Sequence, residues 1–322
     1  MFPSKENLTI CFAHAAYRMK DRFELRKTAI KNFEVRAYDD LQKRVGEADV
    51  VVVSGMWKNE LIPGAGKLKF IQSISSGMDQ YSKEQLAAKG VRLASAAGVN
   101  ARAVAEHALA LILAVARRLP EARDNQHKKV WRGMLGDLTQ REDELGGKTL
   151  LIVGMGRIGS HLAKLAKAFD MKVAGIRRDP AQGANGADSI HGMADLVKLV
   201  PQADFVALTC ALTPETTGLM SAAAFAAMKP SAVFVNVARG KVADEAALIK
   251  TLQANKIWAA AIDVTADEPL PDASPLWSMP NVFITPHTAG ETRAYEDNVL
   301  DILMENLDRL WRGEKVLRNQ VL

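Results

Sequence analysis

Residues 149–169 read TLLIVGMGRIGSHLAKLAKAF and combine three features in a fixed order. The apolar run Thr149–Val153 has the length and the β-branched content of a buried strand. Three glycines with the spacing G-x-G-x-x-G follow it, and an amphipathic run then extends to Phe169. A strand, a tight turn and a helix in this order open a βαβ unit, which predicts a parallel sheet.

The glycine spacing also predicts a ligand. In such a turn the first glycine allows the sharp bend, the second lets the backbone approach a pyrophosphate, and the third lets the helix pack on the strand. The N-terminus of the helix then faces the anion. We therefore predict a dinucleotide site that is formed by Gly154, Gly156, Arg157, Ile158 and Gly159. Arg157 either lies near the pyrophosphate or points to solvent.

The end of the next predicted strand, Lys172–Ile176, bears on the choice of coenzyme. About 20 residues after the first glycine, chains that bind NAD place an acidic residue for the ribose 2′-hydroxyl. Here the strand runs into Arg177 and Arg178, whose guanidinium groups match a 2′-phosphate in charge and geometry. The sequence therefore favours NADP(H), with NAD(H) possible. The alternative is that both arginines are solvated and that Asp179 holds the ribose of NAD.

The alternation of strand-like and helical runs continues after this unit and predicts a doubly wound sheet. The predicted strands that follow are Asp204–Thr209, Ala232–Val237, Trp258–Val264 and Asn281–Thr285. The predicted helices that accompany them are Arg157–Phe169, Met193–Leu199, Ala222–Met228 and Glu245–Ala254.

A second set of short apolar runs precedes residue 100 and predicts another parallel sheet. Its predicted strands are Leu8–Ala13, Phe33–Tyr38, Val50–Gly55, Lys69–Ser73 and Val91–Ala94, and Ser82–Lys89 is a predicted helix. An apolar run from Asn100 to Arg118 predicts a buried helix at a domain boundary, before the polar segment Glu121–Gly147. Residues Glu291–Arg312 have helical spacing and are expected to return to the first domain.

These patterns predict an α/β protein with two doubly wound parallel-sheet domains and a cleft between them. A Rossmann cofactor domain is expected at residues 100–290. A flavodoxin-like substrate domain is expected at residues 1–99, completed by residues 291–322.

Composition excludes several classes of protein. The chain has 322 residues, of which 48% are apolar and 25% charged, so disorder, collagen and coiled coil are excluded. Its 42 basic and 37 acidic residues are interspersed, which argues against nucleic acid as a partner. The N-terminus lacks a secretory signal, and the longest uncharged apolar stretch, residues 108–116, is too short to span a membrane. With only two cysteines, we expect a soluble protein of the reducing cytoplasm.

Three ionisable residues follow predicted strands of the second domain, namely Arg239, Glu268 and His287. Ligands bind at this edge of open α/β sheets. An arginine can bind a carboxylate through two hydrogen bonds, a histidine titrates near neutral pH, and a neighbouring carboxylate orients its ring. Together the three suit carbonyl reduction. Singly, each has a plainer interpretation, as a surface arginine, part of a proline-rich turn, and one of six histidines.

The sequence resembles the D-isomer-specific 2-hydroxyacid dehydrogenase family over nearly its whole length. The motifs that carry the resemblance are Ser75–Asp79, Asn100–Glu106, Gly154–Gly159, Leu212–Thr216, Asn236–Gly240, Asp263–Pro269 and Pro286-His287. Thr288-Ala289 and the arginines after Ile176 depart from the common family pattern.

The resemblance implies a role for each candidate residue. His287 would be the general acid/base, Glu268 its partner, and Arg239 the residue that binds a 2-oxo-carboxylate. Backbone N–H groups around Ser76 and Gly77 would hold this carboxylate across the cleft, while hydride passes from the nicotinamide to C2. Asp263 is counted among the cofactor-binding residues. Asp263 and Asn236 are also expected to support the site through hydrogen bonds, although caps at strand ends explain both equally well.

Substrate and assembly are less closely defined. A wall formed by Trp57 and Trp131 would favour a small 2-oxoacid such as glyoxylate or hydroxypyruvate, although tryptophans more often belong to a core. The resemblance implies a homodimer through the cofactor domain, with the helix Val104–Val115 and the segment 121–147 as candidate contacts. The alternative is that this helix is internal core.

Two rival functions remain. One is an NAD-dependent dehydrogenase of the same family. For such an enzyme no long C-terminal regulatory extension is expected here, because the chain ends at Leu322. The other is a non-catalytic nucleotide-sensing interaction protein, which the presence of all three ionisable residues disfavours.

Overall fold

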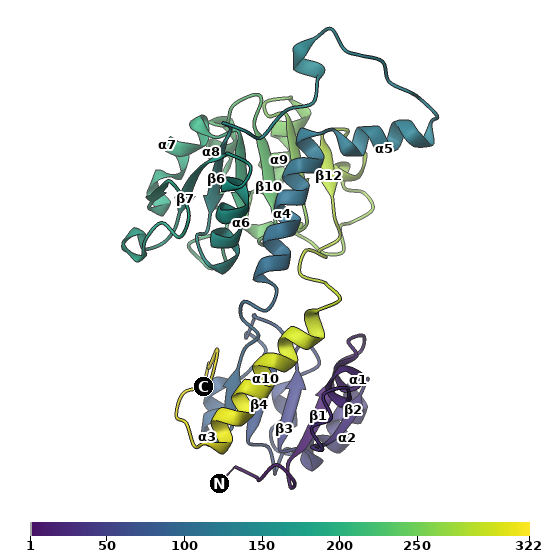
Figure 1. The fold of residues 1–322 in the computed structure, drawn as a ribbon, viewed down its shortest axis with the longest axis vertical. Helices are drawn as coiled ribbons and strands as arrows, with labels where there is room; N and C mark the ends of the chain where they lie inside the picture. Colours follow the sequence, from purple (N-terminus) through teal and green to yellow (C-terminus); the bar gives the residue numbers. More distant parts are fainter. Residues whose placement is uncertain (1) are drawn as a thin grey trace. The chain divides into compact units, whose positions relative to one another are not determined.

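Apolar runs of the chain form two parallel sheets in the computed structural model, which describes residues 2–322 (Figure 1). Two compact units contain them. One unit combines the residues up to Asn100 with Thr292–Leu322, and the other is Ala101–Glu291. Each unit has its own sheet and its own buried core, so the predicted α/β class with two doubly wound sheets is confirmed.

The unit Ala101–Glu291 contains seven parallel strands in the order β12-β11-β10-β9-β6-β7-β8. Their bounds are β6 Thr149–Val153, β7 Lys172–Ile176, β8 Ser189–His191, β9 Phe205–Leu208, β10 Val233–Asn236, β11 Ala259–Ile262 and β12 Val282–Ile284. The strand order reverses between β6 and β9, which is the point of a doubly wound sheet where ligands bind.

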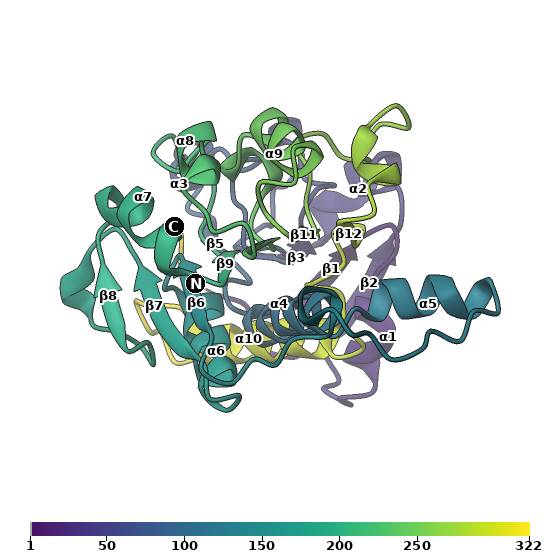
Figure 2. The ribbon, with the colours of Figure 1, turned by 90° about the horizontal axis from the view of Figure 1, so that it is seen from above.

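Strand β6 explains why both faces of this sheet are covered. Leu150 and Ile152 belong to one buried cluster, whereas Leu151 and Val153 belong to another. Successive side chains of a strand point to opposite faces, so an uninterrupted apolar run requires burial on both. Figure 2 shows α4 and α6 on one face and α8 and α9 on the other.

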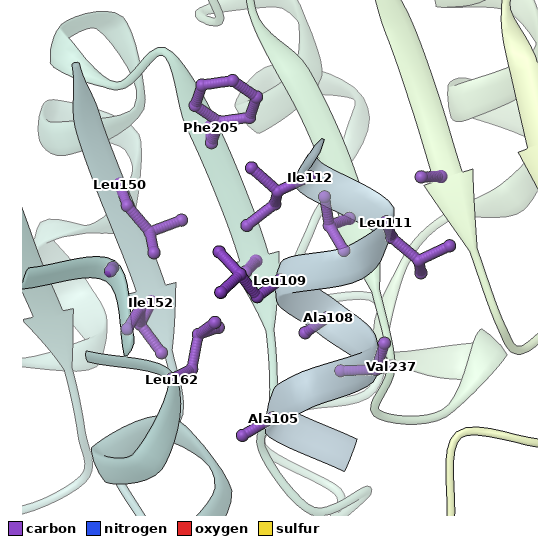
Figure 3. Packing of buried hydrophobic residues seen from close by; sticks show 14 of the residues in the cluster. Ala105, Ala108, Leu109, Leu111, Ile112, Leu150, Ile152, Leu162, Phe205 and Val237 are labelled. Carbon is purple, nitrogen blue, oxygen red and sulfur yellow. The ribbon is translucent and has the colours of Figure 1, made fainter. Parts of the chain in front are cut away.

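The helices of this unit supply those two layers. Their bounds are α4 Ala101–Ala116, α5 Leu119–His127, α6 Arg157–Lys167, α7 Leu196–Leu199, α8 Ala222–Ala226 and α9 Glu245–Gln253. Helix α4 is rich in Ala and Leu and packs against α6, β10 and β11. Its Ala108 and Ile112 lie among the residues of the buried cluster, which includes Ile152 and Leu162 (Figure 3). This helix therefore contributes to the core of its unit.

The other unit contains five parallel strands in the order β2-β1-β3-β4-β5, the flavodoxin-like order. Their bounds are β1 Thr9–Ala13, β2 Lys31–Val35, β3 Val50–Val53, β4 Phe70–Ser73 and β5 Arg92–Ala94. Its helices are α1 Met19–Glu24, α2 Tyr38–Arg44, α3 Lys83–Ala88 and α10 Tyr295–Trp311.

Helix α10 belongs to this unit. It packs against α1 and buries Val299, Leu303 and Leu307 completely. Asn306 is also fully buried, and its amide nitrogen lies 3.0 Å from Oε1 of Gln72 on β4. The remaining polar atoms of the two amides bond to backbone groups, so the helix is fixed to the sheet by both apolar and polar contacts.

Three local predictions need correction. The predicted strand Phe33–Tyr38 is wrong at its end, because β2 stops at Val35 and Tyr38 begins α2, whose first turn contains two aspartates. The three-residue edge strand β8 was missed, since it is too short to show a periodicity. The polar segment after residue 118 contains a helix, α5, which buries none of its side chains and so lacks an apolar stripe.

Within residues 2–322, no helix has the length and apolar content that crossing a membrane requires. No group of three or more metal-binding side chains comes together there either.

Candidate functional site

The three glycines of the turn after β6 have different surroundings. Gly154 and Gly159 are closely packed, whereas Gly156 is open. A Cβ at Gly154 would lie 2.5 Å from the backbone nitrogen of Cys210, and one at Gly159 would lie 2.4 Å from the carbonyl oxygen of Gly154. Gly154 also has a φ of 113°, which L side chains rarely adopt. Gly156 differs, because no heavy atom lies within 4 Å of the position of its Cβ.

This open position fits a bound phosphate. Helix α6 begins directly after Gly156, and no side chain caps its start. The first N–H groups of a helix have no partner within the helix and attract anions. Nothing in the protein itself requires a glycine at residue 156, so close approach of a ligand explains it best.

Arg177 and Arg178 follow β7 directly and make different contacts. Arg177 donates from Nη1 to the carbonyl oxygen of Gly183 at 2.9 Å and from Nη2 to the side chain of Gln182. Arg177 therefore holds its own loop together. Arg178 is exposed, and its charge contributes to lowering the pKa of Glu215, after larger effects from hydrogen bonds to Thr213 and to the backbone.

Asp179 is engaged elsewhere. Its carboxylate accepts hydrogen bonds from the backbone N–H of Ala181 at 3.1 Å and from the Gln182 amide at 3.2 Å. These bonds cap the short 3₁₀ turn Pro180–Gln182. Each Asp179 oxygen accepts one of these bonds and retains capacity for another, so this geometry leaves the alternative in which Asp179 holds a ribose open.

His287 and Glu268 form a close pair beyond the ends of β12 and β11. Nδ1 of His287 lies 2.6 Å from Oε2 of Glu268, and both side chains are partly exposed, at 43% and 37%. The other carboxylate oxygen, Oε1, accepts the backbone N–H of Thr265 at 3.2 Å. When Glu268 is ionised, Nδ1 of His287 must carry the proton of this bond. The other ring nitrogen, Nε2, is not part of it. In the described part of the chain, Nε2 has no hydrogen-bond partner.

The backbone around His287 is held by Asp263 at the end of β11. The N–H of His287 donates to the carbonyl oxygen of Asp263 at 2.8 Å, and the N–H groups of Thr288 and Ala289 donate to its two carboxylate oxygens at 3.0 and 3.1 Å. These three bonds stabilise a φ of 56° at His287, a value that non-glycine residues seldom adopt. Asp263 thus holds the backbone of this loop, and its contact with a cofactor stays a prediction.

Arg239 lies beyond the end of β10, the strand beside β11. Its turn is braced by Asn236, which accepts the N–H of Ala238 at 3.0 Å and donates to the carbonyl oxygen of Arg239 at 3.1 Å. A Cβ on the next residue, Gly240, would lie 1.9 Å from the backbone of Thr265. This contact brings the turn of Arg239 against the loop that leads to Glu268. Arg239 is exposed, and its Nη1 donates to the carbonyl oxygen of Ala238 at 2.7 Å.

In the other unit, Ser76 and Gly77 lie in the exposed loop after β4. The neighbouring Ser75 accepts from the N–H of Ala96 at 3.0 Å, which fixes the start of this loop. Within residues 2–322, the N–H groups of Ser76 and Gly77 donate no hydrogen bond. They are therefore free to bind an anion, and their role as substrate ligands stays a prediction.

The two tryptophans considered for a pocket wall differ in exposure. Trp57 is 2% exposed and belongs to a buried cluster with residues of β3 and β4, which agrees with the alternative that it is part of a core. Trp131 is 98% exposed on the segment after α5. A large aromatic ring surrounded by core side chains on every side cannot contact a substrate.

Sequence reasoning missed two residues near His287. His107, on α4, lies 2.9 Å from the hydroxyl of Thr285, and this hydroxyl lies 2.6 Å from Oδ1 of Asp263. The position of Thr285, two residues before His287, was a local signal for its involvement. No local signal exists for His107, because it lies 178 residues away in the sequence.

Comparisons with known proteins agree with this geometry. Residues 109–289 match the family model described as the D-isomer specific 2-hydroxyacid dehydrogenase, NAD binding domain. The chain is 35% identical to a glyoxylate/hydroxypyruvate reductase B of Citrobacter koseri, over 95% of this chain and 93% of that protein. It is also 35% identical to a D-3-phosphoglycerate dehydrogenase of Methanocaldococcus jannaschii, over 86% of this chain. It spans only about half of that relative's length, 52%.

A solved structure gives the same result for the fold. A family protein of Aeromonas salmonicida superposes with a TM-score of 0.85 and 28% identity, covering 98% of this chain and 99% of the other.

Proposed function

Since the chain belongs to the D-isomer-specific 2-hydroxyacid dehydrogenase family, we propose that it reduces a small 2-oxoacid to the 2-hydroxyacid with NADPH. The observation that carries this proposal is the pair formed by His287 and Glu268, with Arg239 in the adjoining loop. A proton donor and a carboxylate-binding cation in neighbouring loops are the two groups that carbonyl reduction requires of the protein.

His287 acts as the general acid. Glu268 orients the ring through Nδ1, which leaves Nε2 to give its proton to the substrate carbonyl oxygen as this oxygen becomes an alkoxide. In the reverse direction the same nitrogen accepts the proton of the hydroxyl group. Asp263 maintains the backbone conformation that places the ring.

Arg239 binds the substrate carboxylate. An exposed guanidinium whose turn is fixed by Asn236 presents its donors in a rigid fork that matches a carboxylate. The free N–H groups of Ser76 and Gly77 are proposed as further ligands of this carboxylate. Orientation of the 2-oxoacid in this way lowers the entropic part of the barrier.

The nicotinamide coenzyme, when bound, supplies the hydride that C2 receives. The open glycine turn from Gly154 to Gly159 would hold its pyrophosphate at the start of α6. The exposed charge of Arg178 supports NADPH over NADH, because a 2′-phosphate gains a cationic partner there.

Glyoxylate and hydroxypyruvate are the proposed substrates. Support for them comes from the relative of Citrobacter koseri, which matches nearly the full length of both chains. The relative named for D-3-phosphoglycerate matches over about half of its own length. The small acids are therefore preferred to 3-phosphoglycerate chemistry.

The test is oxidation of NADPH and NADH, followed at 340 nm, by the purified protein with glyoxylate, hydroxypyruvate, pyruvate, 3-phosphohydroxypyruvate and a branched 2-oxoacid. Faster turnover with NADPH on glyoxylate and hydroxypyruvate than on the other three acids supports the proposal. Preference for NADH would overturn the coenzyme assignment. Coenzyme binding without turnover on any acid would favour the nucleotide-sensing alternative.

A homodimer is the proposed assembly. Segment 128–147 leaves the body of its unit after α5 (Figure 1) and exposes Val130, Trp131, Met134 and Leu138. Large apolar side chains that gather on one exposed segment are typical of an interface. Sedimentation should give twice the mass of the chain, and Trp131→Glu with Met134→Glu should give monomers. A monomeric parent protein would overturn this assignment.

The cytoplasm is the proposed compartment. Cys11 and Cys210 are both free thiols, and burial raises their pKa values to about 12 and about 11. Neither is a reactive thiolate at neutral pH, which suits a reducing environment.

A further inference from the structure

A chain of hydrogen bonds connects α4 with the loop of His287. Nε2 of His107 lies 2.9 Å from Oγ1 of Thr285, and Oγ1 lies 2.6 Å from Oδ1 of Asp263. Nε2 of His107 is also 3.5 Å from this carboxylate oxygen. The side chain of His107 is 23% exposed and that of Asp263 is 1% exposed, so the chain runs from the edge of α4 into the interior.

The chemistry of the groups fixes the direction of each bond. The Asp263 carboxylate accepts the N–H groups of Thr288 and Ala289, so it acts as an acceptor. The Thr285 hydroxyl has one proton and must donate it to this carboxylate. The remaining bond therefore runs from His107 to Thr285, which requires a proton on Nε2 of His107. Replacement of His107 or Thr285 by a residue without a donor therefore removes a known hydrogen bond of this series.

The chain acts on the conformation of His287. Its φ of 56° is maintained by the N–H groups of three successive residues, 287, 288 and 289, which all donate to Asp263. The Asp263 carboxylate can accept the N–H groups of Thr288 and Ala289 together only while its plane is fixed. Thr285 fixes it at Oδ1, and His107 fixes the rotamer of Thr285.

We propose that His107 and Thr285 are positioning residues, which hold the Asp263 carboxylate so that His287 is aimed at the substrate carbonyl. The proposal rests on the proposed function, because it assigns the two residues to the proton-transfer step. Neither residue contacts the reacting atoms. Their effect on the reaction passes through Asp263 and the backbone of residues 287–289.

Matched substitutions separate positioning from simple packing. Thr285→Val removes the hydroxyl at nearly constant shape, whereas Thr285→Ser keeps it. His107→Leu removes the donor, whereas His107→Gln retains an N–H at a similar reach. In NADPH-dependent reduction of the preferred acid, we expect Thr285→Val and His107→Leu to lower kcat about tenfold or more, since a misplacement of about 1 Å can cost up to about 10²-fold. The dissociation constant of NADPH should change little. The thermal midpoint should fall, because a hydrogen bond in the chain to the buried Asp263 carboxylate is lost, but both variants should stay folded at the assay temperature. Thr285→Ser and His107→Gln should keep most of the parental kcat.

Hydrogen–deuterium exchange of the free protein supplies a readout that needs no turnover. Thr285→Val and His107→Leu should accelerate exchange of the amides of residues 287–289, and the two conservative variants should not. Parental kcat and parental exchange in Thr285→Val would overturn the proposal. Equal losses in Thr285→Ser and Thr285→Val would also overturn it, because packing would then explain both. If the parent reduces no acid, the proposed function fails. The exchange rates alone then decide whether the hydrogen bonds of His107 and Thr285 hold the loop of residues 287–289.

Discussion

Nδ1 of His287 lies 2.6 Å from Oε2 of Glu268, although 19 residues separate them in the sequence. The two residues follow the adjacent parallel strands β12 and β11, whose carboxyl ends lie at the same edge of the sheet. The N–H of Thr265 holds the other carboxylate oxygen. The carboxylate is thus fixed at one oxygen by the backbone and orients the imidazole with the other.

This pair predicts different effects for its two members. His287→Ala should lower kcat by about 10²–10⁴-fold, because general acid–base catalysis contributes about that much. Glu268→Gln should lower kcat less, since it keeps the ring but loses the charged partner. Steady-state kinetics with NADPH and the preferred 2-oxoacid measure both effects.

Coenzyme binding is the control for this prediction. The fluorescence of bound NADPH should report nearly parental affinity in both variants, because neither residue belongs to the glycine turn. Full activity of His287→Ala would remove this residue from the proton-transfer step.

The two arginines after β7 should not be equivalent. Arg178→Ala should weaken NADPH binding by about ten- to a hundredfold, because a hydrogen bond to a charged group contributes about 1.5–3 kcal/mol. NADH lacks the 2′-phosphate and should bind as before. Arg177→Ala is the matched control, since Arg177 already bonds Gly183 and Gln182. Titration of each variant with both coenzymes tests this. An equal loss of NADPH and NADH in Arg178→Ala would contradict the assignment of a 2′-phosphate site.

The glycine turn predicts one variant that folds and one that is strained. Gly156→Ala places its Cβ in open space, so the thermal midpoint should stay parental while coenzyme affinity falls about tenfold, or about 1.4 kcal/mol. Gly159→Ala places a Cβ 2.4 Å from the Gly154 oxygen. Overpacking of this kind costs about 1–3 kcal/mol, so its midpoint should fall. Calorimetry and coenzyme titration of both variants provide the comparison, and parental coenzyme affinity in Gly156→Ala would show that no ligand approaches this position.

Much of the fold was predictable because both sheets are buried on two faces. Strands such as Thr149–Val153 are then continuous apolar runs, which a sequence reveals directly. The parallel order also places Arg239, Glu268 and His287 at one edge, so their proximity follows from chain order alone. Edge strand Ser189–His191 and helix Leu119–His127 gave no such signal, because they bury too little apolar surface to require a pattern.

The rest of the candidate site depends on packing that no local pattern encodes. His107 meets Thr285 only because α4 docks on β10 and β11, and this docking is a property of the whole core. The sequence left open whether Trp57 belongs to a pocket or to a core, and the structure buries it. The sequence likewise could not distinguish Arg177 from Arg178, because the difference is a choice of side-chain rotamer within one loop.

Acid should destabilise the unit Ala101–Glu291 partly through Asp204. Its carboxylate accepts the N–H of Thr149 at 2.8 Å and the ammonium of Lys229 at 2.7 Å, and so ties the start of β6 to β9. Burial acts to raise the pKa of Asp204, but the hydrogen bonds from Lys229 and Thr149 and the charges of Lys229 and Lys148 outweigh it, so the pKa is lowered. A lowered pKa in the folded state means that the carboxylate stabilises the protein above its unfolded pKa of about 3.9. This stabilisation is lost as pH falls through the folded pKa.

Asp204→Asn should therefore lower the free energy of unfolding at pH 7 by roughly 1.5–3 kcal/mol, the contribution of a hydrogen bond to a charged group. The difference from the parent should persist down to about pH 4 and shrink at lower pH, because the parent then loses the same charge. Urea unfolding followed by circular dichroism between pH 7 and pH 2 measures it. Asp272→Asn is the control, since Asp272 is an exposed carboxylate of the same unit and should give a parental curve at every pH. A difference between Asp204→Asn and the parent that stays constant to pH 2 would mean that the lost interaction does not depend on the charge of Asp204.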